Sequence, residues 1–331
     1  MKKRFLSVLL CLAAIFGLCG CQSGDAGLMG NYAAADSVVH ADVGVLAQAD
    51  FAPLTSQWFL CDVTEEMLTE DYTFDAEDPE RDGSAFVINR TTNELVMGYR
   101  MLAKRYPASI TKLMTALLVL KQCDPTDNVT ISKEIAEFRR GSNAELAEGD
   151  QITVSDLLGC LLVVSANNAS LALAEHIAGS EEAFVELMNE EARTLGLGGT
   201  HFANPHGMHD EKHYTTPYDM YVVLQECMKY PEFRKWAEVS KASYDYLDAS
   251  GVAESRTIET TSLFKLGDYE LPEGVTILAG KTGTTTQAGY CLLMIVSNAA
   301  GEEFVVGIFK AESEEKLYNQ MRELLTTYCI S

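Results

Sequence analysis

The chain has 331 residues, of which 47% are hydrophobic, and a formal net charge of −23 at pH 7. This length is sufficient for a large hydrophobic core in one or two domains. The excess of acidic residues argues against nucleic acid or an anionic membrane surface as a partner, because both are bound through basic patches.

The first 20 residues have the pattern of an export signal. Three basic residues at positions 2–4 precede an apolar stretch over residues 5–18, which is short for a membrane span and ends in small residues. The ending LCGC resembles the bacterial lipobox, so we expect residues 1–20 to be a signal peptide and Cys21 to be lipidated. The protein would then be exported and lipid-anchored on the outer face of the cytoplasmic membrane, in the cell-wall compartment. An ordinary cleaved signal and an uncleaved anchor remain alternatives.

Two segments separate this signal from the first predicted strand. Residues 21–55 are rich in Ala, Gly, Asp and Ser without a clear period. We expect them to form a flexible tether with an end-to-end distance of roughly 30–35 Å. Residues 56–83 are acidic and would form an N-terminal extension whose role the sequence does not indicate.

The next segments predict two strands and several helices. Residues 84–98 read as two short strands around a polar turn, and residues 108–122 read as a helix that is apolar on almost all sides. A further helix is expected over residues 169–177. Three other helices begin with N-cap residues. They are 154–164 after Thr153, 181–196 after Ser180, and one that opens with Thr216, Pro217 and Asp219.

The last third of the chain changes to strands. These are expected over 275–286, 287–298 and 302–311, and an amphipathic helix over 313–328 follows them. Strands at both ends with helices between them predict an α+β fold, in which an antiparallel sheet lobe flanked by helices adjoins a helical lobe. Of the cysteines, Cys160 and Cys291 lie in apolar runs and are expected to be buried thiols. Export would permit disulfides, and the sequence does not indicate which cysteines would pair.

One motif near the start of the 108–122 helix suggests nucleophilic catalysis. Ser109 and Lys112 are three residues apart, which places them on one face of a helix. A lysine among apolar residues has a depressed pKa, and a neutral amine beside a hydroxyl is a general base beside a nucleophile. The alternative is that Lys112 reaches solvent from the first turn, and alone this spacing is weak support.

Two later motifs carry further polar groups. Ser165-Ala-Asn167 follows a fully apolar helix, where a simple helix junction is the alternative explanation. Lys281-Thr282-Gly283 lies inside a strand of small and β-branched residues. A glycine in a strand suggests close approach by another backbone or a ligand, and an edge-strand bulge is the alternative.

Together and in this order, these motifs are those of penicillin-binding proteins and class A β-lactamases. Three longer stretches carry a more specific resemblance: AEGDQITVSDLLGCLLVVSANNASLALAEHIAG, GTHFANPHGMHDEKHYTTPYDM and AGKTGTTTQAGYCL. They are similar to the serine D-Ala-D-Ala carboxypeptidases (peptidase family S11, low-molecular-mass penicillin-binding proteins). The resemblance implies a β-lactamase/transpeptidase-like fold, with residues 84–331 as a DD-carboxypeptidase catalytic domain and no cofactor. It also implies peptidoglycan stem peptides as substrates and β-lactam antibiotics as inhibitors.

The resemblance implies a catalytic role for three residues. Ser109 would attack the carbonyl of the penultimate D-Ala, Lys112 would take the serine proton, and Ser165 would relay a proton to the leaving amine. Water would then hydrolyse the acyl-enzyme.

It implies substrate binding by five more residues. Asn167 would hold the base and the substrate amide, while Lys281 and Thr282 would bind the terminal carboxylate. Gly283 leaves space beside them, and the backbone N–H of Thr284 would form the oxyanion hole together with the N–H of the nucleophile.

The sequence also departs from the family pattern. Many relatives have Ser-Gly-Asn-Asp where this chain has Ser-Ala-Asn-Asn, so Asn168 replaces an acid, and Thr284 stands where some relatives have histidine. Some members add a C-terminal β-domain, which we do not expect after a sequence that ends at Ser331.

Other activities stay open beside the carboxypeptidase. A DD-endopeptidase of peptidoglycan cross-links would use the same residues, and a slowly deacylating β-lactam-binding or sensor protein would share them too. A β-lactamase is disfavoured, because the Glu-x-x-Leu-Asn context needed for class A deacylation is missing. His201, His206, His209 and His213 lack the spacing of a helical metal site, and we expect no metal.

Overall fold

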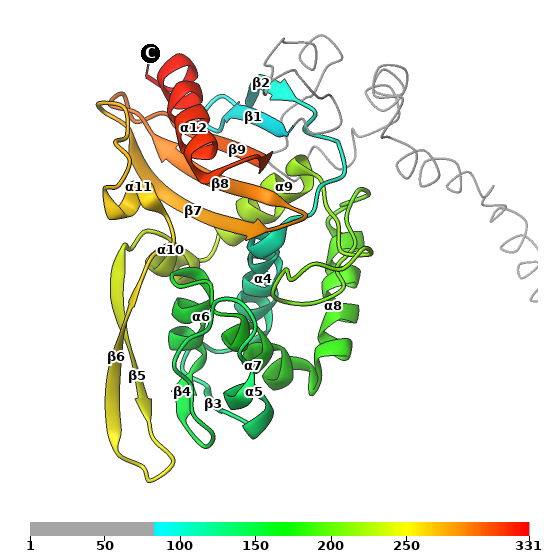
Figure 1. Ribbon diagram of the computed structural model, residues 1–331, viewed down its shortest axis with the longest axis vertical. Coiled ribbons are helices and arrows are strands. Elements are labelled where there is room, and N and C mark those ends of the chain that lie inside the picture. Colours follow the sequence, from blue (N-terminus) through cyan, green and yellow to red (C-terminus); the bar gives the residue numbers. More distant parts are fainter. Residues whose placement is uncertain (1–82, 331) are drawn as a thin grey trace, which may run out of the picture. The chain divides into compact units, whose positions relative to one another are not determined.

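The strands at both ends of the folded chain pair into one antiparallel sheet. The computed structural model describes residues 83–330, so the predicted signal peptide, tether, acidic extension and Cys21 lie outside the described residues. The sheet has the order β2-β1-β9-β8-β7 (Figure 1). Its strands are β1 (Ser84–Asn89), β2 (Glu94–Tyr99), β7 (Thr276–Thr285), β8 (Gly289–Ser297) and β9 (Glu303–Ala311).

Both faces of this sheet are covered, which explains why β8 is apolar throughout. Leu292 and Met294 belong to a core cluster with Met321 of α12 (Glu314–Tyr328), which crosses one face in Figure 1. Leu293 and Ile295, which alternate with them, belong to the larger core shared with the helical lobe. A strand buried on both faces reads as a continuous apolar run.

The helical lobe is inserted between β2 and β7. Its central helix, α4, is buried along one run from Lys112 to Val119 and contacts α6, α7, α8 and α9. The helices are η2 (a 3₁₀ turn, Ala108–Thr111), α4 (Lys112–Gln122), α5 (Lys133–Glu137), α6 (Val154–Leu162), α7 (Asn167–Ala178), α8 (Glu181–Thr194), α9 (Pro217–Cys227), α10 (Pro231–Ala237) and α11 (Leu263–Leu266).

The predicted N-caps are confirmed. The hydroxyls of Thr153, Ser180 and Thr216 accept hydrogen bonds from backbone N–H groups at the third residue of α6, α8 and α9. Several boundaries differ from the prediction, and α6 and α8 each end two residues earlier than expected. The helix expected over 108–122 begins as the 3₁₀ turn η2 and becomes α-helical only at Lys112, and α7 begins at Asn167, two residues earlier than expected.

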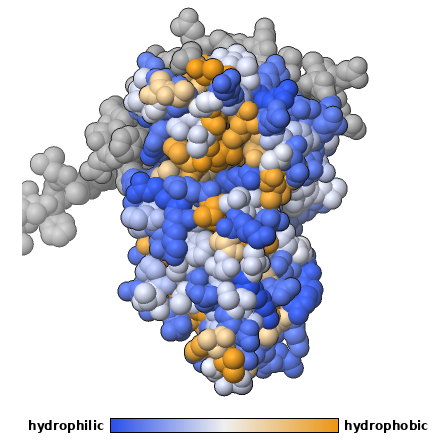
Figure 2. Space-filling model, turned by 90° about the vertical axis from the view of Figure 1, so that its left-hand side faces the viewer, coloured by the Kyte–Doolittle hydropathy of each residue, from blue (hydrophilic) through white to orange (hydrophobic). Residues whose placement is uncertain are grey.

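A second, four-stranded antiparallel sheet was not predicted. Its order is β3-β4-β5-β6, and β5 and β6 form a hairpin beside the helical lobe (Figure 1). Its strands are β3 (Asn128–Thr130), β4 (Gln151–Thr153), β5 (Lys241–Leu247) and β6 (Ala253–Glu259). Figure 2 shows apolar residues over the sheet lobe and at the lower end of the same face. Exposed Leu247 and Val252 lie at the tip of the hairpin.

The observed architecture confirms the α+β class, with a sheet lobe and a helical lobe. Cys160 and Cys291 are buried free thiols, as expected. Among the helices in residues 83–330, none is long and apolar enough to cross a membrane.

Candidate active site

Ser109 lies in the 3₁₀ turn η2, at the junction between the two lobes. Lys112 follows it as the first residue of α4. The Nζ atom of Lys112 is 3.1 Å from the Oγ atom of Ser109, in hydrogen-bond contact. The tight turn therefore brings the two side chains together, as the i, i+3 spacing predicts for one helix face.

Lys112 is fully buried and has three oxygen neighbours. Its Nζ donates to Asn167 Oδ1 and to the carbonyl of His206, each at 2.7 Å, in addition to the contact with Ser109. Burial and, secondarily, the charge of Lys281 hold the pKa of Lys112 well below its usual value of 10.5. The interior thus favours the neutral amine.

The neutral amine has one available arrangement of its protons. Two of its neighbours, the amide oxygen of Asn167 and the carbonyl of His206, can only accept, so they take both N–H donors. The lone pair is then left for the hydroxyl of Ser109. This orientation is the one in which an amine can remove a proton from a nucleophile.

A second lysine meets a second serine on the other side of the site. Lys281 of β7 is 2% exposed and donates to Ser165 Oγ at 2.9 Å and to the carbonyl of Thr282 at 3.1 Å. Burial and the charge of Lys265 lower the pKa of Lys281 to about 7. Ser165 has a φ of +63°, which is rare for a residue other than glycine. Such strain costs on the order of 1–3 kcal/mol and is typical of functional sites.

Gly283 allows β7 to approach the turn that carries Ser109. A Cβ atom added to Gly283 would lie 2.8 Å from the carbonyl oxygen of Pro107 and 3.0 Å from the backbone nitrogen of Ser109. Any side chain would therefore push the strand away from the turn. Beside it, the hydroxyls of Thr282 and Thr261 share a hydrogen bond.

These groups open into one cavity of about 200 Å³ at the edge of β7. It contains five predicted site residues, Ser109, Ser165, Thr282, Gly283 and Thr284. Lys112, Asn167 and Lys281 lie behind this surface and contact it through the hydrogen bonds described above. Other lining residues were not predicted, namely Ser142, Thr261, Tyr290, Cys291, Glu314, Leu317 and Tyr318.

Ser142 reaches the cavity because Asn167 holds its loop. The backbone N–H of Asn167 donates to the carbonyl of Ser142 at 2.7 Å, and its Nδ2 donates to the carbonyl of Arg140 at 2.9 Å. Asn167 therefore joins the loop over residues 138–147 to the amine of Lys112.

Asn168, the residue that departs from the family pattern, holds the same loop. Its Oδ1 accepts from the N–H of Ala144 at 3.0 Å and its Nδ2 donates to the carbonyl of Ala144 at 2.8 Å. The side chain is fully buried. An amide can make both contacts, whereas an ionised carboxylate can only accept.

The four histidines do not form a metal centre. No group of three or more His, Cys, Asp or Glu side chains within residues 83–330 is arranged to hold a metal ion. His206 contributes its backbone carbonyl to Lys112, whereas His213 is a buried ring in contact with Thr111. Sequence reasoning missed both contacts.

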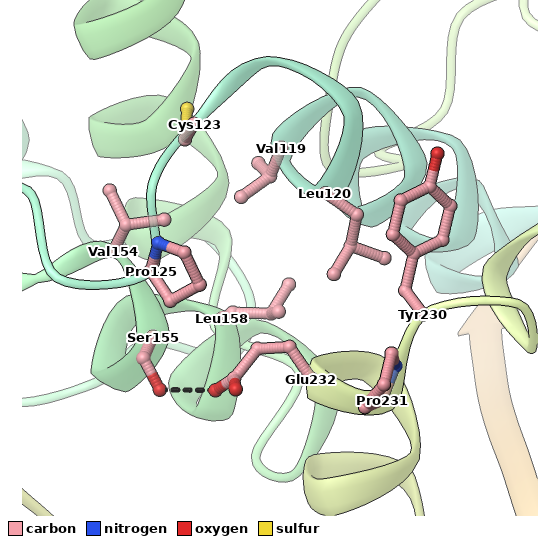
Figure 3. Close-up of a pocket in the computed structure, with 10 residues that line it drawn as sticks. All are labelled: Val119, Leu120, Cys123, Pro125, Val154, Ser155, Leu158, Tyr230, Pro231 and Glu232. Carbon is pink, nitrogen blue, oxygen red and sulfur yellow. Dashed lines mark hydrogen bonds between the residues drawn. The ribbon is translucent and has the colours of Figure 1, made fainter.

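A second cavity of about 310 Å³ lies at the opposite end of α4. Figure 3 shows it between α4, α6 and the start of α10, with mostly apolar side chains and one hydrogen bond from Ser155 to Glu232. It shares no lining residue with the cavity at β7.

Comparisons with known proteins show the family of this chain. The family described as Peptidase S11, D-alanyl-D-alanine carboxypeptidase, matches residues 73–309. The carboxypeptidase DacF of Bacillus subtilis is 34% identical over 247 residues, which are 73% of this chain and 60% of DacF. A D-alanyl-D-alanine endopeptidase of Pseudomonas aeruginosa is 30% identical over 64% of this chain and 66% of its own length.

A solved structure also shares the fold. The crystal structure of the Streptomyces K15 DD-transpeptidase matches with a TM-score of 0.65 and 27% identity, covering 73% of this chain and 93% of that one. The chain thus spans almost all of that enzyme, but only about three fifths of DacF.

Proposed function

The chain belongs to the peptidase S11 family of D-alanyl-D-alanine carboxypeptidases, and from this premise we propose that it removes the terminal D-Ala from peptidoglycan stem pentapeptides. The observation that carries the proposal is the buried amine of Lys112. Its two N–H donors are taken by fixed oxygen acceptors, and its third contact is the hydroxyl of Ser109. This arrangement supports the assignment of Lys112 as a neutral base and of Ser109 as the nucleophile.

The acylation step follows from this arrangement. The hydroxyl proton of Ser109 moves to Lys112 as the serine oxygen bonds to the carbonyl carbon of the penultimate D-Ala. The backbone N–H of Ser109 and of Thr284 stabilise the oxyanion, a contribution of about 3–4 kcal/mol per donor. Ser165 relays this proton from Lys112 to the amine of the departing D-Ala as the C–N bond breaks. Water then attacks the ester: its hydroxyl joins the acyl carbon, and its other proton passes to the Oγ of Ser109 as the ester C–O bond breaks, which regenerates the serine and the neutral lysine.

The substrate carboxylate has a binding site in the same cavity. The hydroxyl-bearing Thr282 and Ser165 line the cavity, and the ammonium of Lys281 lies directly behind Ser165, 2.9 Å from its Oγ. A cation buried next to a hydroxyl favours a carboxylate ligand. β-Lactam antibiotics carry a carboxylate near their reactive carbonyl, and we propose that they acylate Ser109 through the same contacts.

Two alternatives use the same residues. The similarity to endopeptidases from Pseudomonas aeruginosa and Escherichia coli favours cleavage of peptidoglycan cross-links as the second candidate. A slowly deacylating β-lactam-binding or sensor protein would acylate equally well, and it would differ only in the final hydrolysis.

One experiment separates these functions. The full-length protein is incubated with a fluorescent penicillin, with a pentapeptide ending in D-Ala-D-Ala, and with cross-linked muropeptide dimers, beside a Ser109→Ala control. The carboxypeptidase takes up the label and releases D-alanine. Conversion of dimers to monomers without D-alanine release indicates the endopeptidase, and label uptake with no hydrolysis indicates the sensor. An unlabelled, inactive wild-type protein refutes the proposal.

We further propose that Cys21 is lipidated and anchors the catalytic domain, residues 84–331, through the tether 21–55 on the outer face of the cytoplasmic membrane. The sequence LCGC after an apolar stretch supports this. Cells fed a clickable fatty acid should label the wild-type protein but not Cys21→Ala. Equal labelling of the two would contradict the anchor.

A further inference from the structure

A buried chain of hydrogen bonds leads from His213 to the peptide that precedes the nucleophile. We propose that His213 and Thr111 are positioning residues that orient the Ala108–Ser109 peptide, and with it the N–H that binds the oxyanion. The inference rests on the proposed acyl transfer at Ser109. It assigns a role to two residues that touch neither the substrate nor the reacting atoms.

The donor and the acceptor of each hydrogen bond in this series, from Ala203 through His213 and Thr111 to Ala108, can be assigned. The backbone N–H of Ala203 donates to His213 Nδ1 at 3.0 Å, so this nitrogen is an acceptor. In the neutral ring the proton is then on Nε2, which lies 2.7 Å from the Oγ1 of Thr111 and donates to it. The hydroxyl of Thr111 donates in turn to the carbonyl of Ala108, also at 2.7 Å.

The carbonyl that accepts the last hydrogen bond of this series belongs to Ala108, a residue with a strained backbone. Ala108 has a φ of +46°, in the left-handed region that residues other than glycine rarely adopt. This conformation costs about 1–2 kcal/mol, so Ala108 needs contacts that hold it there. Thr111 supplies one of them through its hydroxyl.

Gly207 confines the same carbonyl from another side. A Cβ atom added to Gly207 would lie 1.8 Å from the oxygen of Ala108 and 2.8 Å from the Oγ1 of Thr111. The backbone of the His206–Gly207 segment is therefore packed directly onto the hydrogen-bond chain. The Ala108 carbonyl has a fixed direction because both neighbours restrict it.

Peptide planarity transmits this direction to the catalytic N–H. The Ala108 carbonyl and the Ser109 N–H belong to one planar trans peptide, so they point in opposite directions. Within residues 83–330, the Ser109 N–H has no hydrogen-bond acceptor. It lies beside Gly283, where the absence of a side chain leaves room. Fixing the carbonyl thus aims a free N–H before the substrate arrives, which is the preorganisation that oxyanion stabilisation needs.

His213 acts here as a neutral donor and not as an acid or a base. The ring is 2% exposed, and both nitrogens are already engaged. Burial, above the other influences, lowers the pKa of His213 to about 3. The ring therefore stays neutral over the whole range in which the enzyme would work, and its loss should lower the rate without changing the shape of the pH profile.

The hydroxyl of Thr111 is tested in the full-length protein with Thr111→Val, Thr111→Ser and Thr115→Val. Thr115 is a matched control, since it is equally buried one turn later in the same region and donates to a different carbonyl, that of Pro205 at 2.6 Å. We expect Thr111→Val to lower the penicillin acylation rate and kcat about 10- to 100-fold while KM changes less than about 3-fold. Thr111→Ser and Thr115→Val should stay within about 3-fold of the wild type.

The ring is tested with His213→Gln and His213→Asn. A glutamine amide can place a donor near the former Nε2 and reach Thr111, whereas an asparagine amide replaces only the Nδ1 acceptor for Ala203. We therefore expect His213→Gln to keep a higher penicillin acylation rate than His213→Asn, while the two variants unfold at similar urea concentrations. If Thr111→Val acylates as fast as Thr115→Val, or if Asn is as active as Gln, the inference is wrong although the enzyme is active. An inactive wild type overturns the proposed function as well.

Discussion

Replacing Gly207 with alanine should disable the active site from a position that does not touch the substrate. Gly207 has a φ of +87°, and an added Cβ would meet the oxygen of Ala108 at 1.8 Å. Gly251, at the tip of the β5–β6 hairpin, has a φ of +84° and no atom within 4 Å of the same added Cβ. The two glycines have nearly the same φ and differ in their surroundings, so Gly251→Ala is a matched control.

The structure gives the size of each effect. The left-handed conformation costs an alanine about 1–2 kcal/mol at either position. At Gly207 the added methyl carbon and the oxygen of Ala108 must also move about 1.6 Å further apart, from 1.8 Å to the 3.4 Å at which ordinary contact begins. Overpacking of this kind adds about 1–3 kcal/mol. Gly207→Ala should thus lose about 2–5 kcal/mol of stability, against about 1–2 kcal/mol for Gly251→Ala.

The rate should respond more strongly than the stability. The group that must move is the Ala108 carbonyl, and a displacement of about 1 Å near a reacting group can cost about 100-fold. Urea unfolding gives the free energies of the two variants, and the rate of fluorescent-penicillin uptake gives acylation. We expect a loss of about 100-fold for Gly207→Ala and less than about 2-fold for Gly251→Ala. Equal stability and equal acylation of the two variants would refute the reasoning about the Ala108 carbonyl.

Three other substitutions test the proposed roles of Lys112, Lys281 and Gly283. Lys112→Met should lower acylation by about 10²–10⁴-fold, since it removes the proposed general base, and urea unfolding should show a largely intact fold. Lys265→Met should raise the pKa of Lys281 above about 7, because it removes the neighbouring charge that lowers it. If cationic Lys281 binds the substrate carboxylate, as proposed, kcat/KM falls as the pH rises through this pKa. The fall should shift to higher pH in the variant, and an unchanged pH profile of kcat/KM would contradict the coupling of Lys265 to Lys281. Gly283→Ala should slow acylation, because its Cβ would lie 2.8 Å from the Pro107 carbonyl; a wild-type rate of penicillin uptake would show that β7 can move away freely.

The parts of the fold that could be predicted are those in which neighbouring residues determine the structure. Thr153, Ser180 and Thr216 were recognisable as N-caps because each cap bonds to the N–H three residues later. The β5–β6 hairpin could not be recognised in this way. Its strands are mostly exposed, with only residues such as Tyr244 and Ile258 buried, so they lack a continuous apolar face. β3 and β4 have three residues each, which is too short for a periodic pattern.

In the active site too, contacts between residues close in the sequence could be predicted, and contacts between distant residues could not. Ser109 and Lys112 could be paired from their spacing, because one turn of chain brings them together. Asn167 and Lys281 could be proposed only from their motifs, and the structure places both near that pair. The carbonyl of His206 could not be foreseen, since a backbone oxygen 94 positions from Lys112 has no signature in the sequence. The contact of Thr111 with His213 spans 102 positions and was invisible for the same reason.

The strand order of the sheet determines when this site can exist during synthesis. β1 pairs with β9, so the first strand of the domain has no partner on that side until the last strand has been made. The backbone N–H of Glu303 and the side chain of Thr91, 212 positions apart, meet across this junction. Ser109 and Lys112 are made early, but Lys281 and Gly283 arrive with β7, so folding is dominated by distant contacts and should be slow. A nascent or truncated chain therefore contains Ser109 and Lys112 without a finished site, and under the proposed function the uptake of penicillin should report completion of the whole domain.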